Sequence, residues 1–261
     1  GLISSLRDKC FYASIVLLNS GKELFKTKCL PGEEIDFNGL GSSHIHLDDK
    51  ILLSIGTPEQ VSSKIRELAQ DKNSMFGKII SVDLKTKDFE IVAMGSRNAQ
   101  GLYYDKNKNI IVHTEHGPKG GDEININLNP DNKTIENYGW PISSYGEAQL
   151  KDTWLKKQTL HKSHKDFGFL EPIKYFVPSI AISQIIKIPT NFNERFTNDF
   201  FIGALGYKSQ INEGDQSIHH IRFNENFDQI VFEDIIPIGE RIRDIIFVQE
   251  TNTVLMILET I

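Results

Sequence analysis

Residues 97–127 read RNAQGLYYDKNKNIIVHTEHGPKGGDEININ, and residues 137–141 read NYGWP. The first stretch has an Arg-Asn pair before an apolar run, then a Lys/Asn turn and a second, more hydrophobic run. A Gly/Pro turn with flanking acids follows, and the second stretch closes on Gly-Trp-Pro. Plain core strands do not need so many special residues, so we interpret the region as strands that carry a binding site.

Strand signals dominate the rest of the chain, because short runs rich in Ile, Val and Phe alternate with Asn, Asp, Gly and Lys turns. The pattern predicts strands at 10–17, 23–27, 44–47, 50–55, 77–83, 88–93, 100–104, 109–114, 122–127, 172–176, 181–187, 199–204, 217–223, 228–235, 241–247 and 253–258.

One helix is predicted over 58–71, where Val61, Ile65 and Leu68 form an apolar stripe. Thr57 is its expected N-cap, and Gln60 completes a capping-box pattern. Residues 142–171 are polar and irregular and are predicted to form a long loop.

A weak internal repeat connects these strands. HIHLDDKILLSIG (44–56), GLYYDKNKNIIVHTEHG (101–117) and RIRDIIFVQETNTVLMILET (241–260) share a strand, a polar turn and a more hydrophobic strand, and 179–205 follows the same plan with a longer connection. Repeated antiparallel units with little helix fit a β-propeller. An irregular β-sandwich is the alternative.

Polar residues recur where the repeats begin, namely Asn38, Arg97, Asn98, Arg241 and Arg243. In a propeller, equivalent positions of different blades surround one axis, so these side chains are expected to converge. Several arginines with an asparagine suit a ligand that has several carboxylates. For each arginine alone, a surface or inter-blade salt bridge is the simpler interpretation.

Bulk properties narrow the class of protein. The chain has 261 residues and a net charge of −6, with 39% hydrophobic and 25% charged residues. This composition is typical of a globular protein, and the lack of a basic block argues against nucleic acid as the partner. No apolar run reaches the roughly 18–20 residues of a membrane span. The chain begins with Gly1, and we expect an N-terminal segment to be missing.

The two cysteines, Cys10 and Cys29, flank a predicted hairpin whose turn is 19–22. Their nearly symmetric positions allow a disulfide in an oxidising compartment. Two small buried residues in a sheet are the equally weighted alternative.

The chain resembles the soluble PQQ-dependent aldose sugar dehydrogenases, the glucose/sorbosone dehydrogenase family. The resemblance rests on GSRNAQGL (95–102), TEHGPKGGDEIN (114–125), NYGWP, FFIGAL (200–205) and GERIRD (239–244). It implies an all-β, six-bladed β-propeller over residues 1–261 as a single domain, with the first blade incomplete. It also implies a periplasmic or secreted location.

The family oxidises the C1 hydroxyl of aldoses to lactones with pyrroloquinoline quinone (PQQ) and calcium. By resemblance Arg97, Asn98, Arg241 and Arg243 bind PQQ, and Arg97 also lies beside the reacting carbonyl as a catalytic residue. The carbonyls of Gly117 and Pro118 correspond to ligands of the Ca²⁺ that bridges to PQQ. Glu123 and Tyr138 match a second, structural calcium site. Taken alone, GPKGGDE is a tight acidic turn.

Three positions depart from the family pattern. Asn38 stands where the family has its catalytic His, and a neutral amide cannot take up a proton. Thr57 stands where an acid orients that His, and Gly206 stands where a Lys contacts PQQ, with Lys208 two residues late. His44 or His46 is a candidate displaced base, although a packed or exposed strand histidine is the simpler interpretation, and His116 is expected to be structural.

The first hypothesis is therefore a PQQ- and Ca²⁺-dependent dehydrogenase acting on a sugar or another alcohol, with an unknown electron acceptor. The second is a catalytically silent propeller that binds PQQ, a sugar or a protein partner. A structural propeller without a ligand is the third, and it leaves the arginines unexplained.

Overall fold

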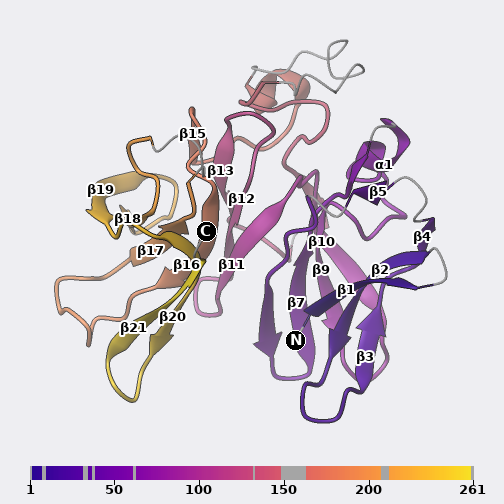
Figure 1. Cartoon of the computed structure of the whole chain (residues 1–261), viewed down its shortest axis with the longest axis horizontal. Coiled ribbons are helices and arrows are strands. Elements are labelled where there is room, and N and C mark those ends of the chain that lie inside the picture. Colours follow the sequence, from indigo (N-terminus) through magenta and orange to yellow (C-terminus); the bar gives the residue numbers. More distant parts are fainter. Residues whose placement is uncertain are drawn as a thin grey trace. The chain divides into compact units, whose positions relative to one another are not determined.

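The computed structural model describes residues 2–7, 10–31, 35–36, 39–60, 63–131, 133–147, 163–206 and 212–259. Two compact units divide the chain (Figure 1). Unit 1 comprises 1–99, 130–144 and 148–170, and unit 2 comprises 100–129, 145–147 and 171–261. Each unit is described by itself.

Unit 1 contains three antiparallel or mixed sheets. The first has the order β1–β2–β3, with β4 also paired to β2; the second pairs β5 with β8; the third has the order β14–β10–β9–β7–β6. The strands are β1 (Leu2–Arg7), β2 (Cys10–Val16), β3 (Glu23–Lys26), β4 (Leu30–Pro31), β5 (Ile35–Asp36), β6 (His44–Leu47), β7 (Lys50–Ile55), β8 (Glu59–Gln60), β9 (Lys78–Asp83), β10 (Phe89–Met94) and β14 (Glu136–Asn137). The helices are α1 (Ser63–Glu67) and the 3-10 helix η2 (His164–Phe167).

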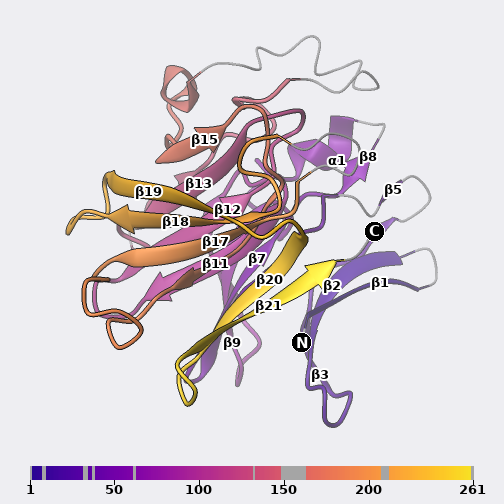
Figure 2. The same ribbon diagram turned by 60° about the vertical axis from the view of Figure 1, so that its left-hand side comes forward.

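Unit 2 contains two four-stranded antiparallel sheets and a hairpin, which Figure 2 shows from a second side. The orders are β11–β12–β13–β15, β16–β17–β18–β19 and β20–β21. The strands are β11 (Ala99–Asp105), β12 (Ile110–Glu115), β13 (Asp122–Asn127), β15 (Lys174–Phe176), β16 (Ile182–Lys187), β17 (Asp199–Ala204), β18 (Ser217–Phe223), β19 (Ile230–Pro237), β20 (Arg241–Val248) and β21 (Thr253–Glu259).

The strand predictions are confirmed. Each predicted strand is present within two residues at either end, and the predicted repeats are the hairpins β6–β7, β11–β12, β16–β17 and β20–β21. Each of these four hairpins supplies the first two strands, in chain order, of the sheet to which it belongs. The all-β class is confirmed, whereas the number of blades and the closure of a ring stay predictions.

The helix prediction over 58–71 is largely wrong. Helix α1 covers Ser63–Glu67, and Glu59–Gln60 instead form β8, which pairs with β5. Thr57 is no N-cap, because its hydroxyl donates to the carbonyl of Ser96 at 2.8 Å. The loop prediction for 142–171 holds for 142–147 apart from the bridge of Glu147 to Lys119, and it fails at η2; residues 148–162 lie outside the described part.

Each unit has its own apolar core. In unit 1, Leu53, Phe76, Ile80 and Val82 belong to one buried cluster. In unit 2, side chains from both four-stranded sheets form another, in which the rings of Phe200 and Phe223 meet edge to face at 5.3 Å. Burial of these side chains is the main driving force for each unit.

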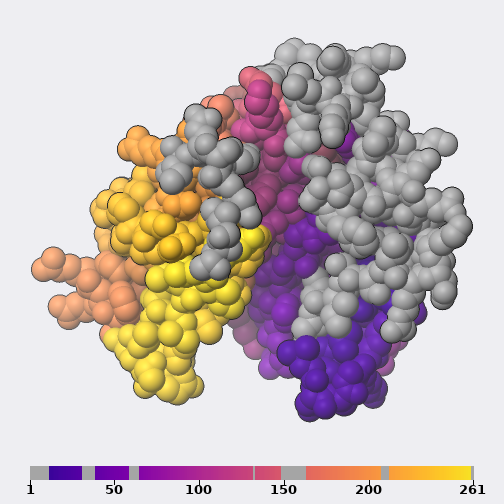
Figure 3. All heavy atoms as spheres, viewed as in Figure 1, coloured from indigo at the N-terminus to yellow at the C-terminus, as the bar shows by residue number. Residues whose placement is uncertain are grey.

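The hairpin β20–β21, yellow in Figure 3, lies at the surface and leaves Leu255 and Ile257 50% and 60% exposed. Cys29 is disulfide-bonded, which agrees with the first of the two cysteine alternatives. No helix among the described residues is long and apolar enough to cross a membrane.

The buried side chain of Lys78, the first residue of β9, forms hydrogen bonds with the segment that follows α1. Lys78 is fully buried, and its ammonium donates to the carbonyls of Leu68, Ala69 and Phe76 at 2.7, 2.9 and 2.9 Å. The carbonyls of Leu68 and Ala69 directly follow α1, and the carbonyl of Phe76 lies two residues before β9. Lys78 therefore joins these segments through one donor group, in addition to the amides of Asp71 and Gly95, which donate to the carbonyls of Leu68 and Ala69.

Replacing Lys78 with Met is expected to destabilise the protein by about 2–4 kcal/mol, because three buried carbonyls lose a donor. Burial lowers the pKa of Lys78 to about 7 from 10.5. The unfolded chain then binds more protons between these values, so the Lys78-dependent part of the unfolding free energy rises with pH from about 7 toward 10.5. Denaturant unfolding of wild type and Lys78→Met across this range measures the difference, with exposed Lys85→Met as control. Parallel pH profiles for wild type and Lys78→Met contradict the assignment.

Candidate cofactor site

Arg97 is a buried cation in unit 1, between β10 and the start of β11. It is 7% exposed, and its guanidinium carbon lies 5.3 Å from the ring centroid of Trp140. Its own carbonyl accepts a hydrogen bond from the amide of Thr57 at 2.6 Å. The predicted cofactor residue is thus held by its backbone, and its charged group rests against an aromatic face.

Asn98 and Gly56 fix the loop that leads into β6. The side-chain oxygen of Asn98 accepts a hydrogen bond from the amide of Gly41 at 2.7 Å. A Cβ on Gly56 would lie 2.2 Å from the carbonyl oxygen of Gly39, so this approach requires glycine. Asn38 itself lies outside the described residues, and its role stays a prediction.

Thr57 is engaged in structure at the position where the family has an acid. Its hydroxyl and amide both bind the 96–97 segment, and its side chain is 1% exposed. A hydroxyl that donates to a backbone carbonyl is no substitute for a carboxylate that orients a histidine. The sequence interpretation of this departure is therefore consistent with the local geometry.

The Glu-His-Gly-Pro turn in unit 2 begins at the end of β12, and hydrogen bonds to Asp122 hold it in place. The buried carboxylate of Asp122 accepts hydrogen bonds from the amides of Gly117 and Ile182, both at 3.1 Å. A Cβ on Gly117 would lie 2.2 Å from the carbonyl oxygen of Gly120, which explains the glycine. His116 Nε2 donates to the carbonyl of Ile182 at 2.6 Å, so its expected structural role is confirmed.

This turn has the chemistry that calcium prefers. The candidate ligands at Gly117 and Pro118 are backbone carbonyls on a rigid turn, and hard cations bind such oxygens. Glu123 is 3% exposed and accepts from the side chain of Asn125 at 3.1 Å, and Tyr138 is 1% exposed. These two residues belong to different units, so their shared calcium site stays a prediction. No group of three or more His, Cys, Asp or Glu that could hold a metal occurs in the described part of the chain.

The arginines of β20 have an internal anionic neighbour. Arg243 Nη2 lies 2.5 Å from a carboxylate oxygen of Glu259, and Arg241 Nη2 lies 3.6 Å from the same oxygen. Arg241 is 9% exposed and also donates to the carbonyls of Leu205 and Gly206. Both arginines thus point a guanidinium toward one carboxylate, which is the group that a polycarboxylate ligand presents.

Gly206 differs from the family's lysine for a visible reason. It has φ +64, and a Cβ at this position would lie 2.7 Å from Cβ of Asp215. A lysine therefore requires both a strained backbone and a shift of the 215 segment. Lys208 lies outside the described residues.

The strand histidines do not form a buried base. His44 and His46 are exposed on one face of β6, opposite Leu53 and Ile51 in β7. His113, which the sequence interpretation missed, is fully buried in β12, and burial lowers its pKa to about 3. A histidine with so low a pKa stays neutral at physiological pH.

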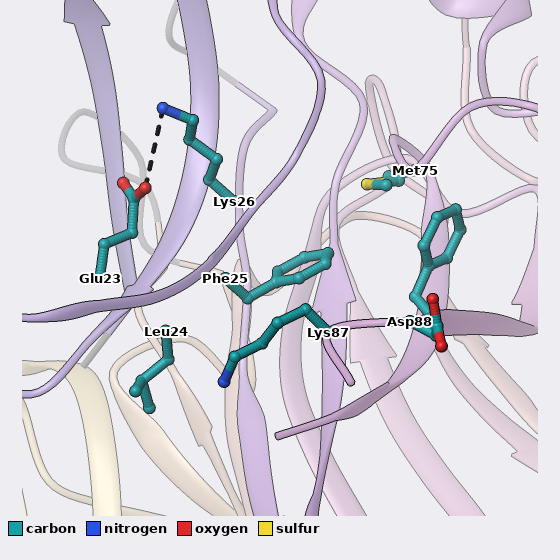
Figure 4. A pocket seen from close by; sticks show the side chains of 8 residues that line it. Glu23, Leu24, Phe25, Lys26, Met75, Lys87 and Asp88 are labelled. Atoms are coloured by element: carbon teal, nitrogen blue, oxygen red, sulfur yellow. Dashed lines mark ion pairs between the residues drawn. The ribbon is translucent and has the colours of Figure 1, made fainter. Parts of the chain in front are cut away.

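A cleft of about 510 Å³ lies elsewhere in unit 1 (Figure 4). Its apolar lining is Leu24, Phe25, Met75 and Phe89. An exposed ion pair of Glu23 with Lys26, 3.7 Å long, lies at one side. No predicted site residue lines it. The cleft therefore lends no support to the cofactor prediction.

Sequence reasoning missed Trp140 and Glu259 as neighbours of the predicted arginines. Trp140 was visible within NYGWP, but a sequence motif does not identify the cation that its ring contacts. Glu259 lies directly opposite Arg241 in the β20–β21 register, so pairing the two strands in the repeat identifies this neighbour. The two groups of arginines belong to different units, and their convergence on one ligand stays a prediction.

The described sheets define an all-β protein with the fold of soluble sugar dehydrogenases. The structure of the apo-form of soluble aldose sugar dehydrogenase from Escherichia coli superposes with a TM-score of 0.67 and 21% identity, covering 98% of this chain and 74% of that one. The PQQ domain of pyranose dehydrogenase from Coprinopsis cinerea, in its holo form, gives a TM-score of 0.52 and 10% identity, covering 88% and 63%. At these identities the likeness concerns the fold, which belongs to the β-propeller enzymes.

The model of the glucose/sorbosone dehydrogenase family matches residues 18–260, and the chain belongs to this family. An uncharacterized protein of Synechocystis is 31% identical over 217 residues, which are 76% of this chain and 48% of that protein. The chain thus spans about half the length, or less, of the curated relatives it matches.

Asp122→Asn is expected to destabilise unit 2 by about 1.5–3 kcal/mol, because a carboxylate that accepts from two amides is replaced by an amide with one acceptor oxygen. The Glu-His-Gly-Pro turn should then bind Ca²⁺ more weakly. Thermal unfolding with and without Ca²⁺ measures both effects, and exposed Asp88→Asn is the control. A variant as stable as wild type, with the same Ca²⁺-dependent shift, contradicts this role.

Glu259→Gln is expected to tighten the binding of PQQ about twofold to fivefold at low salt. The change removes a competing negative charge beside Arg241 and Arg243, and the gain is modest because Arg243 is half exposed. Titration calorimetry measures the dissociation constant, with Glu250→Gln in the turn of the same hairpin as control. Weaker binding by Glu259→Gln would show that the carboxylate orients the arginines instead of competing for them.

Proposed function

We propose that this chain provides the cofactor-binding part of a quinoprotein that oxidises the C1 hydroxyl of aldose sugars with PQQ and calcium. The observation that carries the proposal is the buried guanidinium of Arg97 at the position where the family binds PQQ. A guanidinium at this position suits a carboxylate of such a ligand. The rigid carbonyl turn at Gly117 and Pro118 supports the calcium part.

The residues fit the proposed ligands in charge and donor type. In unit 1 Arg97 is a buried cation, and in unit 2 Arg241 is buried and Arg243 is half exposed; guanidinium groups of this kind suit carboxylates. Bound PQQ would supply the hydride acceptor that no side chain can provide. Arg97 would stabilise negative charge that develops on the ligand, and the carbonyls of Gly117 and Pro118 would hold calcium.

Proton removal from the sugar hydroxyl is the weak step for this chain. Asn38 stands at the family's base position, and an amide has no basic site at neutral pH. The side chain of Thr57 is already hydrogen-bonded to Ser96. We therefore expect low turnover with aldoses even when the cofactor is bound.

A catalytically silent PQQ-binding propeller is the second candidate. It is favoured by Asn38 together with the structural use of Thr57 and Gly206, since all three family positions around the base and the cofactor lysine have changed. In this case the arginines and the calcium turn would serve binding alone. In this second candidate the ligand could also be a sugar or a protein partner in place of PQQ.

We place the protein in the periplasm or outside the cell. Disulfides persist in oxidising compartments, and the disulfide-bonded Cys29 supports this placement. The electron acceptor is a separate, unidentified partner.

Titration calorimetry of the full-length protein with PQQ and Ca²⁺ tests the proposal. We expect binding that is lost with a calcium chelator, and dye reduction with a panel of aldoses that is slow in wild type. Asn38→His should raise turnover by about 10²–10⁴-fold by supplying a base. Absence of PQQ binding contradicts the proposal, and wild-type turnover equal to that of Asn38→His excludes the silent candidate.

A further inference from the structure

The indole of Trp140 restricts where Arg97 can point. Both side chains are buried, at 5% and 7% exposure, with 5.3 Å between the guanidinium carbon and the ring centroid. A cation is attracted to the face of an indole, and a planar guanidinium packs against it in few orientations. Packing against the ring therefore reduces the number of rotamers that the long Arg97 side chain can adopt.

Trp140 is itself fixed on both sides of its backbone. Its amide donates to the carbonyl of Gly95 at 2.9 Å, and its carbonyl accepts from Nε2 of Gln70 at 2.6 Å. Gly95 begins the segment that contains Arg97. The backbone of the turn at 137–141 is thus tied directly to the backbone that carries the cation.

An amide pair holds this turn in place. Asn137 Nδ2 donates to Oε1 of Gln70 at 2.7 Å, and Gln70 Nε2 donates to Oδ1 of Asn137 at 3.1 Å. The same oxygen of Asn137 accepts from the amide of Gly139 at 2.9 Å. A Cβ on Gly95 would lie 2.2 Å from this oxygen, so the two segments pack in contact.

The connection extends into the sheet. Strand β14 pairs in parallel with β10, so that Met94 faces Asn137 and Ala93 faces Glu136. The motifs GSRN and NYGWP are far apart in sequence but lie side by side in the structure. Strand pairing and the amide pair join their backbones, and the indole packs against the Arg97 guanidinium.

We propose that Trp140 is a positioning residue that sets the direction of the Arg97 guanidinium, and that the Gln70–Asn137 amide pair is its anchor. The role of this contact rests on the proposed function: it would direct the positive charge of Arg97 toward an anionic ligand. Preorganised charge stabilises developing negative charge without reorganisation during the reaction.

The contact is tested first without cofactor. The chain has two tryptophans, Trp140 and Trp154, so Trp154→Phe leaves Trp140 as the one indole. Adding Arg97→Met should change the emission intensity or maximum, whereas exposed Arg195→Met should not. Adding Gln70→Met to Trp154→Phe should make the emission more easily quenched by acrylamide. An emission spectrum indifferent to Arg97→Met overturns the contact, and unchanged quenching overturns the anchor.

Cofactor affinity tests the positioning role through a double-mutant cycle. Trp140→Leu should weaken PQQ binding about twofold to thirtyfold, as expected for loss of a cation–π contact, and Trp140→Phe should keep most of the affinity. In the Arg97→Met background, Trp140→Leu should cause no further loss, because the ring acts through the arginine. Additive losses, or equal losses for Leu and Phe, overturn the proposal.

Two controls separate the possible failures. Circular dichroism melting of each variant identifies loss of folding, and Trp140→Phe keeps the cycle informative where Trp140→Leu does not fold. If wild type binds no PQQ, the proposed function fails, and the fluorescence of the cofactor-free protein decides the positioning of Arg97 by itself.

Discussion

The burial of the Arg97 guanidinium is the constraint on which the candidate site in unit 1 depends. A guanidinium stays charged at any physiological pH, so its burial must be compensated by contacts or by a ligand. The chain places an indole against it and ties its backbone to Thr57 and, through Gly95, to Trp140. These contacts come from segments distant in sequence, which is why three separate motifs are needed to place one charge.

The strands could be predicted from the sequence because each alternates or runs apolar between strong turn signals, as in β12 and β17. The errors have physical causes. Strands of two residues carry no periodicity and are defined only by their pairing. Strand β14, for example, is defined by its pairing with β10. The helix over 58–71 was predicted from an apolar stripe and a capping pattern. The Thr57 hydroxyl instead donates a tertiary hydrogen bond to the carbonyl of Ser96, and local propensity is a weak guide against such a contact.

The sequence assigned residues to the candidate site but did not give their neighbours. Ordered motifs carry the resemblance that assigns Arg97, Arg241 and the Gly117–Pro118 turn to the site, and these assignments stay predictions. Their partners Trp140 and Glu259 are ordinary residue types whose roles come from three-dimensional proximity. No local pattern in the sequence records that Trp140 packs against Arg97, whereas the register of the β20–β21 hairpin places Glu259 opposite Arg241.

The departures from the family are more informative as a group than one by one. Thr57 is committed to the 96–97 backbone, and Gly206 has a conformation and a neighbour, Asp215, that disfavour a lysine. Yet Asn98 and Gly56 still fix the loop beside Asn38, and Arg97 is still buried on its indole. The departures therefore fall at the positions around the expected base and cofactor lysine, whereas Arg97 and its packing against Trp140 are present.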